Sequence, residues 1–319
     1  MMQPILLALL VSISCLWLFI RVAPRLGLID RPNARSLHER PTVVGAGIAP
    51  VLGAMVGWLL WPAFPVAAPV GLSLAIAALL VTGLVDDRYP LPSAPRLLVY
   101  AGAVASVLAL EWWGQLPPFA ILVLLPGLLW LINLYNFMDG ADGFAGLQLL
   151  LVALGMGLLC QFGPAPALAP FWWILAAAML PFLILNWPPA RCFLGDAGAI
   201  PLGMLLGVGG VLSAMAERSL GLAWLVLMMP FLIDATGTLL LRLRAGHSPV
   251  EPHRDHAYQR IARRTGSPLV IDLGLALLHL LWQFPLAITV ITQSLFTPIA
   301  VIFSAIPTLL LLVYVRRAA

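Results

Sequence analysis

The chain is built from long apolar runs that are separated by short polar gaps. Hydrophobic residues make up 62% of its 319 positions and charged residues only 9%. Because about 20 apolar residues span the ~30 Å hydrocarbon core of a bilayer, such runs predict membrane helices. The pattern predicts eleven of them, at residues 3–20, 45–62, 67–85, 96–113, 118–136, 143–162, 169–187, 198–214, 220–241, 268–290 and 294–315. We therefore expect an all-α polytopic membrane protein whose residues 1–319 form a single membrane domain.

Charged side chains concentrate in five of the gaps, which are residues 21–42, 85–96, 136–143, 186–198 and 242–266. The remaining gaps are short and look like plain connectors. Gaps that only joined helices would not need so many aspartates, histidines and arginines. The sequence therefore predicts that these five gaps hold the chemistry.

The arginines predict how the chain is oriented in the membrane. All 17 basic residues are arginine, and with eleven spans only Arg218 falls on the side opposite the five gaps. The positive-inside rule then places the five gaps and the C-terminus in the cytoplasm and the N-terminus outside. The first apolar run has neither a basic region before it nor a small-residue cleavage site after it. We expect it to be a retained span.

Composition narrows the class of protein further. A mean hydropathy of +1.02 excludes an ordinary soluble domain. The arginines raise the isoelectric point to about 9.3, but they form no long basic tract. This suits membrane lipids and phosphates and argues against nucleic acid. The three cysteines, at positions 15, 160 and 192, lie far apart, so neither a disulfide framework nor a zinc site is indicated.

Aspartates that are candidate metal ligands lie in three of the gaps. Asp86 and Asp87 end the third span, where adjacent charges are costly unless a cation compensates them, and Mg²⁺ prefers such oxygen ligands. The pair alone fits a solvated helix end equally well. Asp139 and Asp142 follow Asn133 and Asn136 among glycines, which favours a polar ligand or metal site over a plain turn.

Asp196, in the fourth gap, precedes a predicted span, and an aspartate there usually caps the helix. Next to two other acidic clusters on one membrane face, a metal-ligand role is the better interpretation. In the fifth gap, His253 and His256 flank Arg254 and Asp255, an arrangement suited to phosphate oxygens. A solvated loop that only sets topology would account for the outlying arginines but not for this cluster.

Other polar residues allow less specific expectations. In the first gap, Arg35, His38 and Arg40 either set topology or meet an anionic head group. His279 and Gln283, inside the tenth predicted span, are expected to hydrogen-bond between helices. Asp234 lies inside the ninth span, where a carboxylate is a candidate for function or for charge pairing.

The chain resembles the polyprenyl-phosphate N-acetylhexosamine-1-phosphate transferases. The resemblance rests on four motifs that follow one another along the chain: D-D, N-x-x-N-F-M-D-G-x-D-G, F-L-G-D-A-G and S-P-V-E-P-H-R-D-H. The early pattern R-P-N-x-R-x-x-H-x-x-P-T-x-x-G-x-G is similar too, so the resemblance covers residues 30–259. It implies transfer of a sugar 1-phosphate from a UDP-N-acetylhexosamine to undecaprenyl phosphate with release of UMP. It further implies Mg²⁺, or alternatively Mn²⁺, and a site on the cytoplasmic face of a bacterial inner membrane.

The resemblance assigns roles to individual residues. The catalytic set is Asp86, Asp87, His253 and His256. The metal set is Asp196, Asp87 and Asp139. The substrate-binding set is Asp30, Asn136, Asp139, Gly140, Asp142, Asn186, Phe193 and Arg254. Within it Gly140, Asp142, Asn186 and Phe193 correspond to a uracil pocket, in which Phe193 stacks on the base.

Two departures from the family pattern bear on the donor. The peptidoglycan branch has three consecutive histidines in the last loop, whereas this chain reads H-R-D-H-A-Y. This favours GlcNAc, or a 6-deoxy sugar such as FucNAc or QuiNAc, over MurNAc-pentapeptide, and so a start of O-antigen or related glycans. The basic residue that often follows the D-D pair in that branch is also absent, with Arg88 or Arg96 as its replacement.

The resemblance leaves several alternatives open. We expect the lipid phosphate to attack the β-phosphorus directly, with Asp86 or Asp87 taking a proton, while a covalent aspartyl intermediate is the alternative. A homodimer is compatible with the sequence. The rival class is an ion-coupled transporter, which would place its carboxylates at mid-membrane in two related halves. Here most carboxylates lie at one interface, and no half-repeat is visible.

Overall fold

The computed structural model describes residues 2–32, 40–61, 69–248, 253–292 and 297–317. Its helices are α1 (Met2–Val22), α2 (Ile48–Leu59), α3 (Pro69–Arg88), α4 (Ser93–Glu111), α5 (Pro118–Phe137), α6 (Phe144–Phe162), η1 (Pro166–Leu168), α7 (Ala169–Asn186), α8 (Asp196–Ala216), α9 (Arg218–Arg244), α10 (Ala257–Thr265), α11 (Pro268–Leu278), η2 (His279–Gln283), α12 (Phe284–Ile291) and α13 (Thr297–Arg317). Two strands, β1 (Ile29–Asp30) and β2 (Thr42–Val43), complete it. Arg35 and His38 lie outside the described residues.

Each of the eleven predicted spans contains a helix. In the described part of the chain, nine helices are long and apolar enough to cross a membrane. Of the other two predicted spans, α2 has 12 residues, about 18 Å at the rise of an α-helix, and α3 ends in Asp86, Asp87 and Arg88. The protein is therefore an all-α, multi-pass membrane protein.

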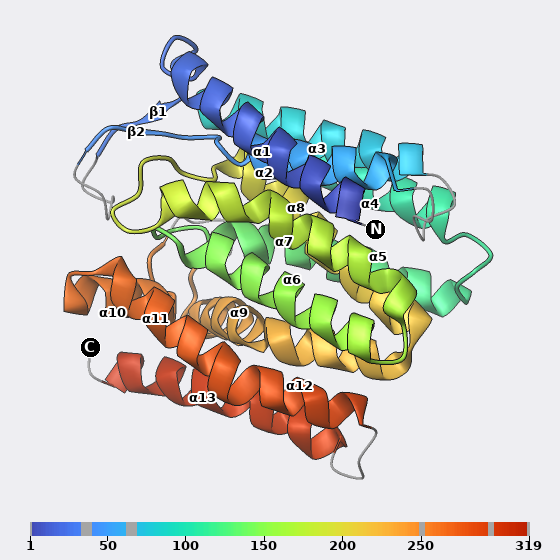
Figure 1. Cartoon of the computed structure of the whole chain (residues 1–319). Coiled ribbons are helices and arrows are strands. Elements are labelled where there is room, and N and C mark those ends of the chain that lie inside the picture. Colours follow the sequence, from blue (N-terminus) through green and yellow to red (C-terminus); the bar gives the residue numbers. More distant parts are fainter. Residues whose placement is uncertain (1, 33–39, 62–68, 249–252, 293–296, 318–319) are drawn as a thin grey trace.

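The helices form a bundle with α8 inside it. Helix α8 packs against α2, α3, α5 and α9, and most of its residues are buried. The strands β1 and β2, helix α10 and the C-terminus lie at one end of the bundle, and the N-terminus lies toward the other (Figure 1). We call the end with β1, β2 and α10 the polar end, because the described parts of the five charged gaps lie there.

Glycines allow α8 to approach its neighbours at the polar end. A Cβ atom on Gly198 would lie 2.6 Å from the Cα atom of Gly47, so α2 and α8 meet backbone to backbone. A Cβ on Gly83 would overlap the backbone of Asp196 in the same way, which brings the end of α3 against the start of α8. These contacts place the acidic ends of two helices side by side.

Two parts of the polar end, the β1–β2 pair and helix α10, were not predicted from the sequence. Strands β1 and β2 pair antiparallel, with Asp30 opposite Thr42, and Val43 also bridges to Cys192. Helix α10 forms where the sequence indicated only a loop. Both are shorter than the window over which apolar periodicity is readable.

The intramembrane hydrogen bonds expected from His279 and Gln283 are confirmed. His279 Nε2 lies 2.8 Å from Gln148 Oε1 on α6, and Gln283 Nε2 donates to the carbonyl of Ser304 on α13 at 2.9 Å. Both polar groups therefore join helices within the apolar part of the bundle, where an unpaired group is costly.

The contact between α2 and α8 predicts a stability difference between two glycine substitutions. Gly47→Ala would force apart two backbones, and overpacking of this kind typically costs about 1–3 kcal/mol. Gly102→Ala in α4 is the matched control, because an added Cβ there meets no atom within 4 Å and alanine favours a helix. Thermal unfolding in detergent should show a lower midpoint for Gly47→Ala only. Equal midpoints would contradict the close packing.

Candidate active site

The fourth gap, residues 186–198, is where the other gaps converge. Its Phe193 N–H donates at 2.7 Å to the carbonyl of Val43, which lies in β2 directly after the first gap. The Ala190 N–H donates to Asp142 Oδ2 in the third gap at 2.9 Å. The fifth gap is attached to the third, because the Tyr258 hydroxyl donates to the carbonyl of Phe137 at 3.0 Å. Residues far apart in the sequence thus form one surface.

Asp87 joins the second gap to the fourth. Its Oδ1 accepts a hydrogen bond from the Asp196 N–H at 2.8 Å, and its Oδ2 accepts one from the Ala197 N–H at 3.1 Å. These are the first N–H groups of α8, which has no local side-chain cap, so Asp87 caps that helix from α3. Gly195 precedes the helix at φ +69°, and a Cβ there would lie 2.5 Å from Asp87 Oδ2. Only glycine fits this joint.

The capping contact leaves the Asp196 side chain available for other partners. Arg96 Nη1 lies 3.1 Å from Asp196 Oδ2 and forms a second ion pair with Asp86 Oδ2. Asp86 Oδ1 accepts the Leu91 N–H at 2.5 Å. Of the two arginines considered as the missing basic residue, Arg96 lies in this cluster, whereas the Arg88 guanidinium lies over the Tyr89 ring at 4.7 Å.

Asp139 adds a further carboxyl group to the same cluster. Burial raises its pKa well above the usual range, and the negative charges of Asp196 and Asp87 raise it further, although a hydrogen bond from the Gly195 N–H opposes this. Burial is the largest cause of this shift, and the neighbouring carboxylates, whose charge a bound cation would offset, add to it.

The acidic cluster fits a divalent cation by its charge and donor type. Hard carboxylate oxygens from Asp86, Asp87, Asp139 and Asp196 are the ligands that Mg²⁺ and Mn²⁺ prefer. Within the described ranges, no three His, Cys, Asp or Glu side chains already converge as a ligand set. The fit to a cation therefore rests on the negative charge of the cluster. Arg96 forms ion pairs with Asp86 and Asp196 in this cluster.

The four residues assigned to a uracil pocket lie on two gaps that are joined by hydrogen bonds. Asn186 Oδ1 accepts the Gly143 N–H at 3.0 Å, and its Nδ2 donates to the carbonyl of Cys192 at 2.8 Å. Asn186 is buried, and these contacts use both ends of its amide to hold the two gaps together. The Asp142 carboxylate accepts a hydrogen bond from the Ala190 N–H, whereas the Phe193 side chain is half-buried.

Asn136 and Gly140 lie in the third gap and Asp30 lies in the first. Asn136 is half-buried in the last turn of α5, and Gly140 is exposed beneath Tyr258, where an added Cβ would overlap the Tyr258 hydroxyl. Asp30 lies in β1 opposite Thr42. Tyr258 stands where some members of the family have a further histidine, and the sequence suggested no role for it. Its ring stacks on that of Phe144, with 4.6 Å between the ring centroids.

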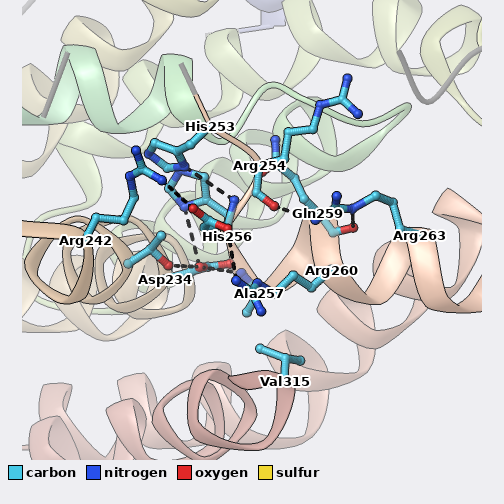
Figure 2. A network of polar contacts seen from close by, with 12 residues as sticks. Asp234, Arg242, His253, Arg254, His256, Ala257, Gln259, Arg260, Arg263 and Val315 are labelled. Carbon is cyan, nitrogen blue, oxygen red and sulfur yellow. Dashed lines mark hydrogen bonds and ion pairs between the residues drawn. The ribbon is translucent and has the colours of Figure 1, made fainter. Parts of the chain in front are cut away.

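The fifth gap forms a charged loop that leads into α10 (Figure 2). Asp255 accepts from Arg242 on α9 at 2.5 Å and from Arg260 on α10 at 2.9 Å. Burial acts to raise the pKa of Asp255, but hydrogen bonds from the two arginines outweigh it and lower the pKa. The rings of His253 and His256 lie 5.0 Å apart, and the Arg254 carbonyl accepts from Arg263 at 2.6 Å.

Comparison with known proteins places this site in a family. Residues 69–214 match the glycosyl transferase family 4. An undecaprenyl-phosphate α-N-acetylglucosaminyl 1-phosphate transferase of Yersinia pestis is 29% identical over 80% of this chain and 74% of its own length. A decaprenyl-phosphate N-acetylglucosaminephosphotransferase of Mycolicibacterium smegmatis is 28% identical over 75% and 70%. A phospho-N-acetylmuramoyl-pentapeptide-transferase of Synechococcus is 31% identical over 69% and 67%.

The protein is therefore a membrane enzyme of the class that moves sugar phosphates onto lipids. It belongs to the polyprenyl-phosphate N-acetylhexosamine-1-phosphate transferases, as the motifs had indicated. Relatives from the N-acetylglucosamine and muramoyl-pentapeptide branches match with similar identity, so identity alone does not single out the donor sugar.

The contact between Gly140 and Tyr258 predicts a coupled pair. Gly140→Ala should destabilise the docking of α10 by about 1–2 kcal/mol, because its Cβ would overlap the Tyr258 hydroxyl. Tyr258→Phe alone should cost about 1 kcal/mol for the lost hydrogen bond to Phe137. In the double variant the alanine should cost less, since the overlapping oxygen is gone. Unfolding of the four proteins in detergent measures the coupling, and strictly additive effects would refute the contact.

Proposed function

We propose that the protein transfers N-acetylhexosamine 1-phosphate from a UDP-sugar to undecaprenyl phosphate and releases UMP. The observation that carries this proposal is the cluster of Asp86, Asp87, Asp139 and Asp196 beside a histidine and arginine loop, in a member of this family. Two anionic phosphates must meet for this reaction. A cation-binding acidic cluster and a cationic loop are the features that such a meeting requires.

In the proposed step, an oxygen of the lipid phosphate attacks the β-phosphorus of the UDP-sugar. A new P–O bond forms there, and the bond from the β-phosphorus to the oxygen of the α-phosphate breaks, so that UMP leaves with that oxygen. A proton on the lipid phosphate passes to the carboxylate of Asp86 or Asp87. Mg²⁺, when bound by Asp87, Asp139 and Asp196, supplies neutralisation of the charge that develops on the phosphates.

The other residues bind and orient in this proposal. His253, Arg254 and His256 face the pyrophosphate from the fifth gap, because arginine and histidine donate to phosphate oxygens. Phe193 and Asp142 contact the uracil, with Asn186 holding their two gaps together. Asp30 and Asn136 lie at the edge of the same surface. The two-step alternative proceeds through an aspartyl phosphate, and protein labelled from a UDP-sugar without lipid would favour it.

A groove on the bundle suits the lipid chain. It has a volume of about 690 Å³ and is lined almost entirely by apolar and glycine residues of α5, α8 and α9, among them Leu128, Gly207 and Trp224. The groove lies in the half of the bundle away from the polar end and includes Arg218 at the start of α9, so a polyprenyl chain would occupy it by extending across the bundle from a phosphate at the polar end. The site would then face the cytoplasm of a bacterial inner membrane, as the arginine distribution indicates.

GlcNAc is the donor we propose to test first, with FucNAc and QuiNAc as the 6-deoxy alternatives. The lack of three consecutive histidines in the fifth gap supports these donors over MurNAc-pentapeptide. The product would start an O-antigen or related lipid-linked glycan. A homodimer is compatible with the proposal but is not required by it. The relatives reported above are transferases by name, which leaves the transporter alternative without support.

Activity in membranes tests the assignment of the acidic cluster. Asp196→Asn should lower the formation of labelled lipid from radioactive UDP-GlcNAc by about a hundredfold or more, because it removes a charged metal ligand. Removal of Mg²⁺ by a chelator should abolish the activity, and its return should restore it. Glu217→Gln is the matched control, since that carboxylate precedes α9 at the opposite end of the bundle.

Two results would count against this assignment. Full activity of Asp196→Asn would remove Asp196 from the metal set. The absence of any lipid-linked product with every UDP-N-acetylhexosamine would reject the proposed reaction itself. Loss of activity in Glu217→Gln would show that the assay responds to misfolding.

A further inference from the structure

Asp234 is a buried carboxylate that the proposed reaction does not use. It lies within α9 and is only 3% exposed. Burying a charge in an apolar bundle is costly unless hydrogen bonds compensate it. Its Oδ1 accepts the Ala257 N–H at 2.8 Å (Figure 2). The same oxygen accepts the Thr238 hydroxyl at 3.2 Å, and Oδ2 accepts the Tyr258 N–H at 3.1 Å. Both oxygens are therefore occupied by donors.

Two of these donors are the first N–H groups of α10. The residue before the helix, His256, forms no side-chain cap, so α10 has no local acceptor for these groups. A carboxylate is the favoured partner at a helix N-terminus, because it accepts their hydrogen bonds and interacts well with the helix dipole. Asp234 therefore caps α10 from α9, just as Asp87 caps α8 from α3.

Helix α10 packs against its neighbouring helices on only part of its surface. A cavity of about 370 Å³ lies between α9, α10, α11 and α13, and Asp234, Tyr258 and Ile261 are among its lining residues. Because this side of α10 lines a cavity and does not pack closely on a neighbouring helix, its polar contacts carry more of its attachment. The Asp234 cap fixes the start of the helix, and the Arg242–Asp255–Arg260 ion pairs fix the loop before it.

His256 is the residue whose place depends most directly on this cap. It immediately precedes α10 and is itself 3% exposed. Its Nδ1 lies 3.6 Å from Asp234 Oδ1, within range for an ion pair but too far for a hydrogen bond. Its ring lies next to those of Phe137, at 6.3 Å between centroids, and His253, at 5.0 Å. A shift at the start of α10 would therefore move both histidines.

We propose that Asp234 is a positioning residue of the transferase, which holds the start of α10 and thereby sets the place of His256 and His253 at the polar end. This inference rests on the proposed function for the catalytic role of the histidines. The capping contact itself is a property of the fold and can be tested without turnover.

The test compares Asp234→Asn with Thr238→Val in the full-length protein. Both variants are nearly isosteric with the native residue, and both weaken or remove the contact between residues 234 and 238. Only Asp234→Asn also removes the negative charge and one of the two acceptors for the N–H groups of α10. Thr238→Val is therefore the matched control for disturbance of this part of α9.

Hydrogen exchange in detergent is the first measurement. Asp234→Asn should speed amide exchange of residues 257–260 about tenfold, while the first turn of α8, which Asp87 caps, keeps its native rate. Thr238→Val should leave both regions close to wild type. Unchanged exchange in α10, or an equal rise in α8, would overturn the positioning role, because the former shows no cap and the latter shows general destabilisation.

Steady-state kinetics is the second measurement. Asp234→Asn should lower kcat about tenfold or more, since misplacing a reacting group by a fraction of an ångström is costly. The KM for the UDP-sugar should rise by a smaller factor than kcat falls, because the displaced loop contacts only the pyrophosphate, while the proposed uracil contacts lie on other gaps. A kcat within about twofold of Thr238→Val would overturn the inference. If wild-type protein forms no lipid product, the proposed function fails, and the exchange measurement still decides whether Asp234 holds α10.

Discussion

Asp87 connects the end of α3 to the start of α8 through two hydrogen bonds, and the positions of the other site residues depend on this contact. Its carboxylate accepts the first N–H groups of α8, an interaction worth about 1 kcal/mol as a cap and more with the helix dipole. Because the joint is tight, Gly45 and Gly195 must lie against the carboxylate without side chains. The Asp196 side chain is then left beside Asp86 and Arg96.

The same device occurs twice at the polar end. Asp87 and Asp234 are both carboxylates of long helices, and each caps a second helix that begins at a functional motif. A membrane bundle is rigid, whereas the connections between its helices are not. An aspartate on a membrane helix therefore fixes the start of a second helix. In one case this holds Asp196 in place, and in the other it holds His256. The acidic cluster and the cationic loop are both held in this way at the polar end, where the proposed reaction would bring a lipid phosphate and a nucleotide sugar together.

The sequence predicts the bundle well, because long apolar runs admit few other structures in a membrane. It also predicts which gaps come together, since spacing and arginine content assign them to one side. It does not predict that Asn186 uses both ends of its amide on neighbouring backbone, or that Asp234 caps α10. The contact of Asn186 with Gly143 joins residues 43 positions apart and that of Asp234 with Ala257 joins residues 23 positions apart, and no local pattern encodes them. Arg96 was only one of two candidates from sequence, and its place between Asp86 and Asp196 required the packing of α3, α4 and α8.

The central claim is that the protein moves a sugar together with its phosphate. It is tested most directly by following the β-phosphate of UDP-GlcNAc, carrying a radioactive label, in a reaction of the purified protein with undecaprenyl phosphate and Mg²⁺. The account predicts that the label enters the lipid and that unlabelled UMP is released in equal amount. Label that stays with the nucleotide as UDP, while the sugar enters the lipid, would contradict it, because the enzyme would then break the bond to the sugar and leave the pyrophosphate intact.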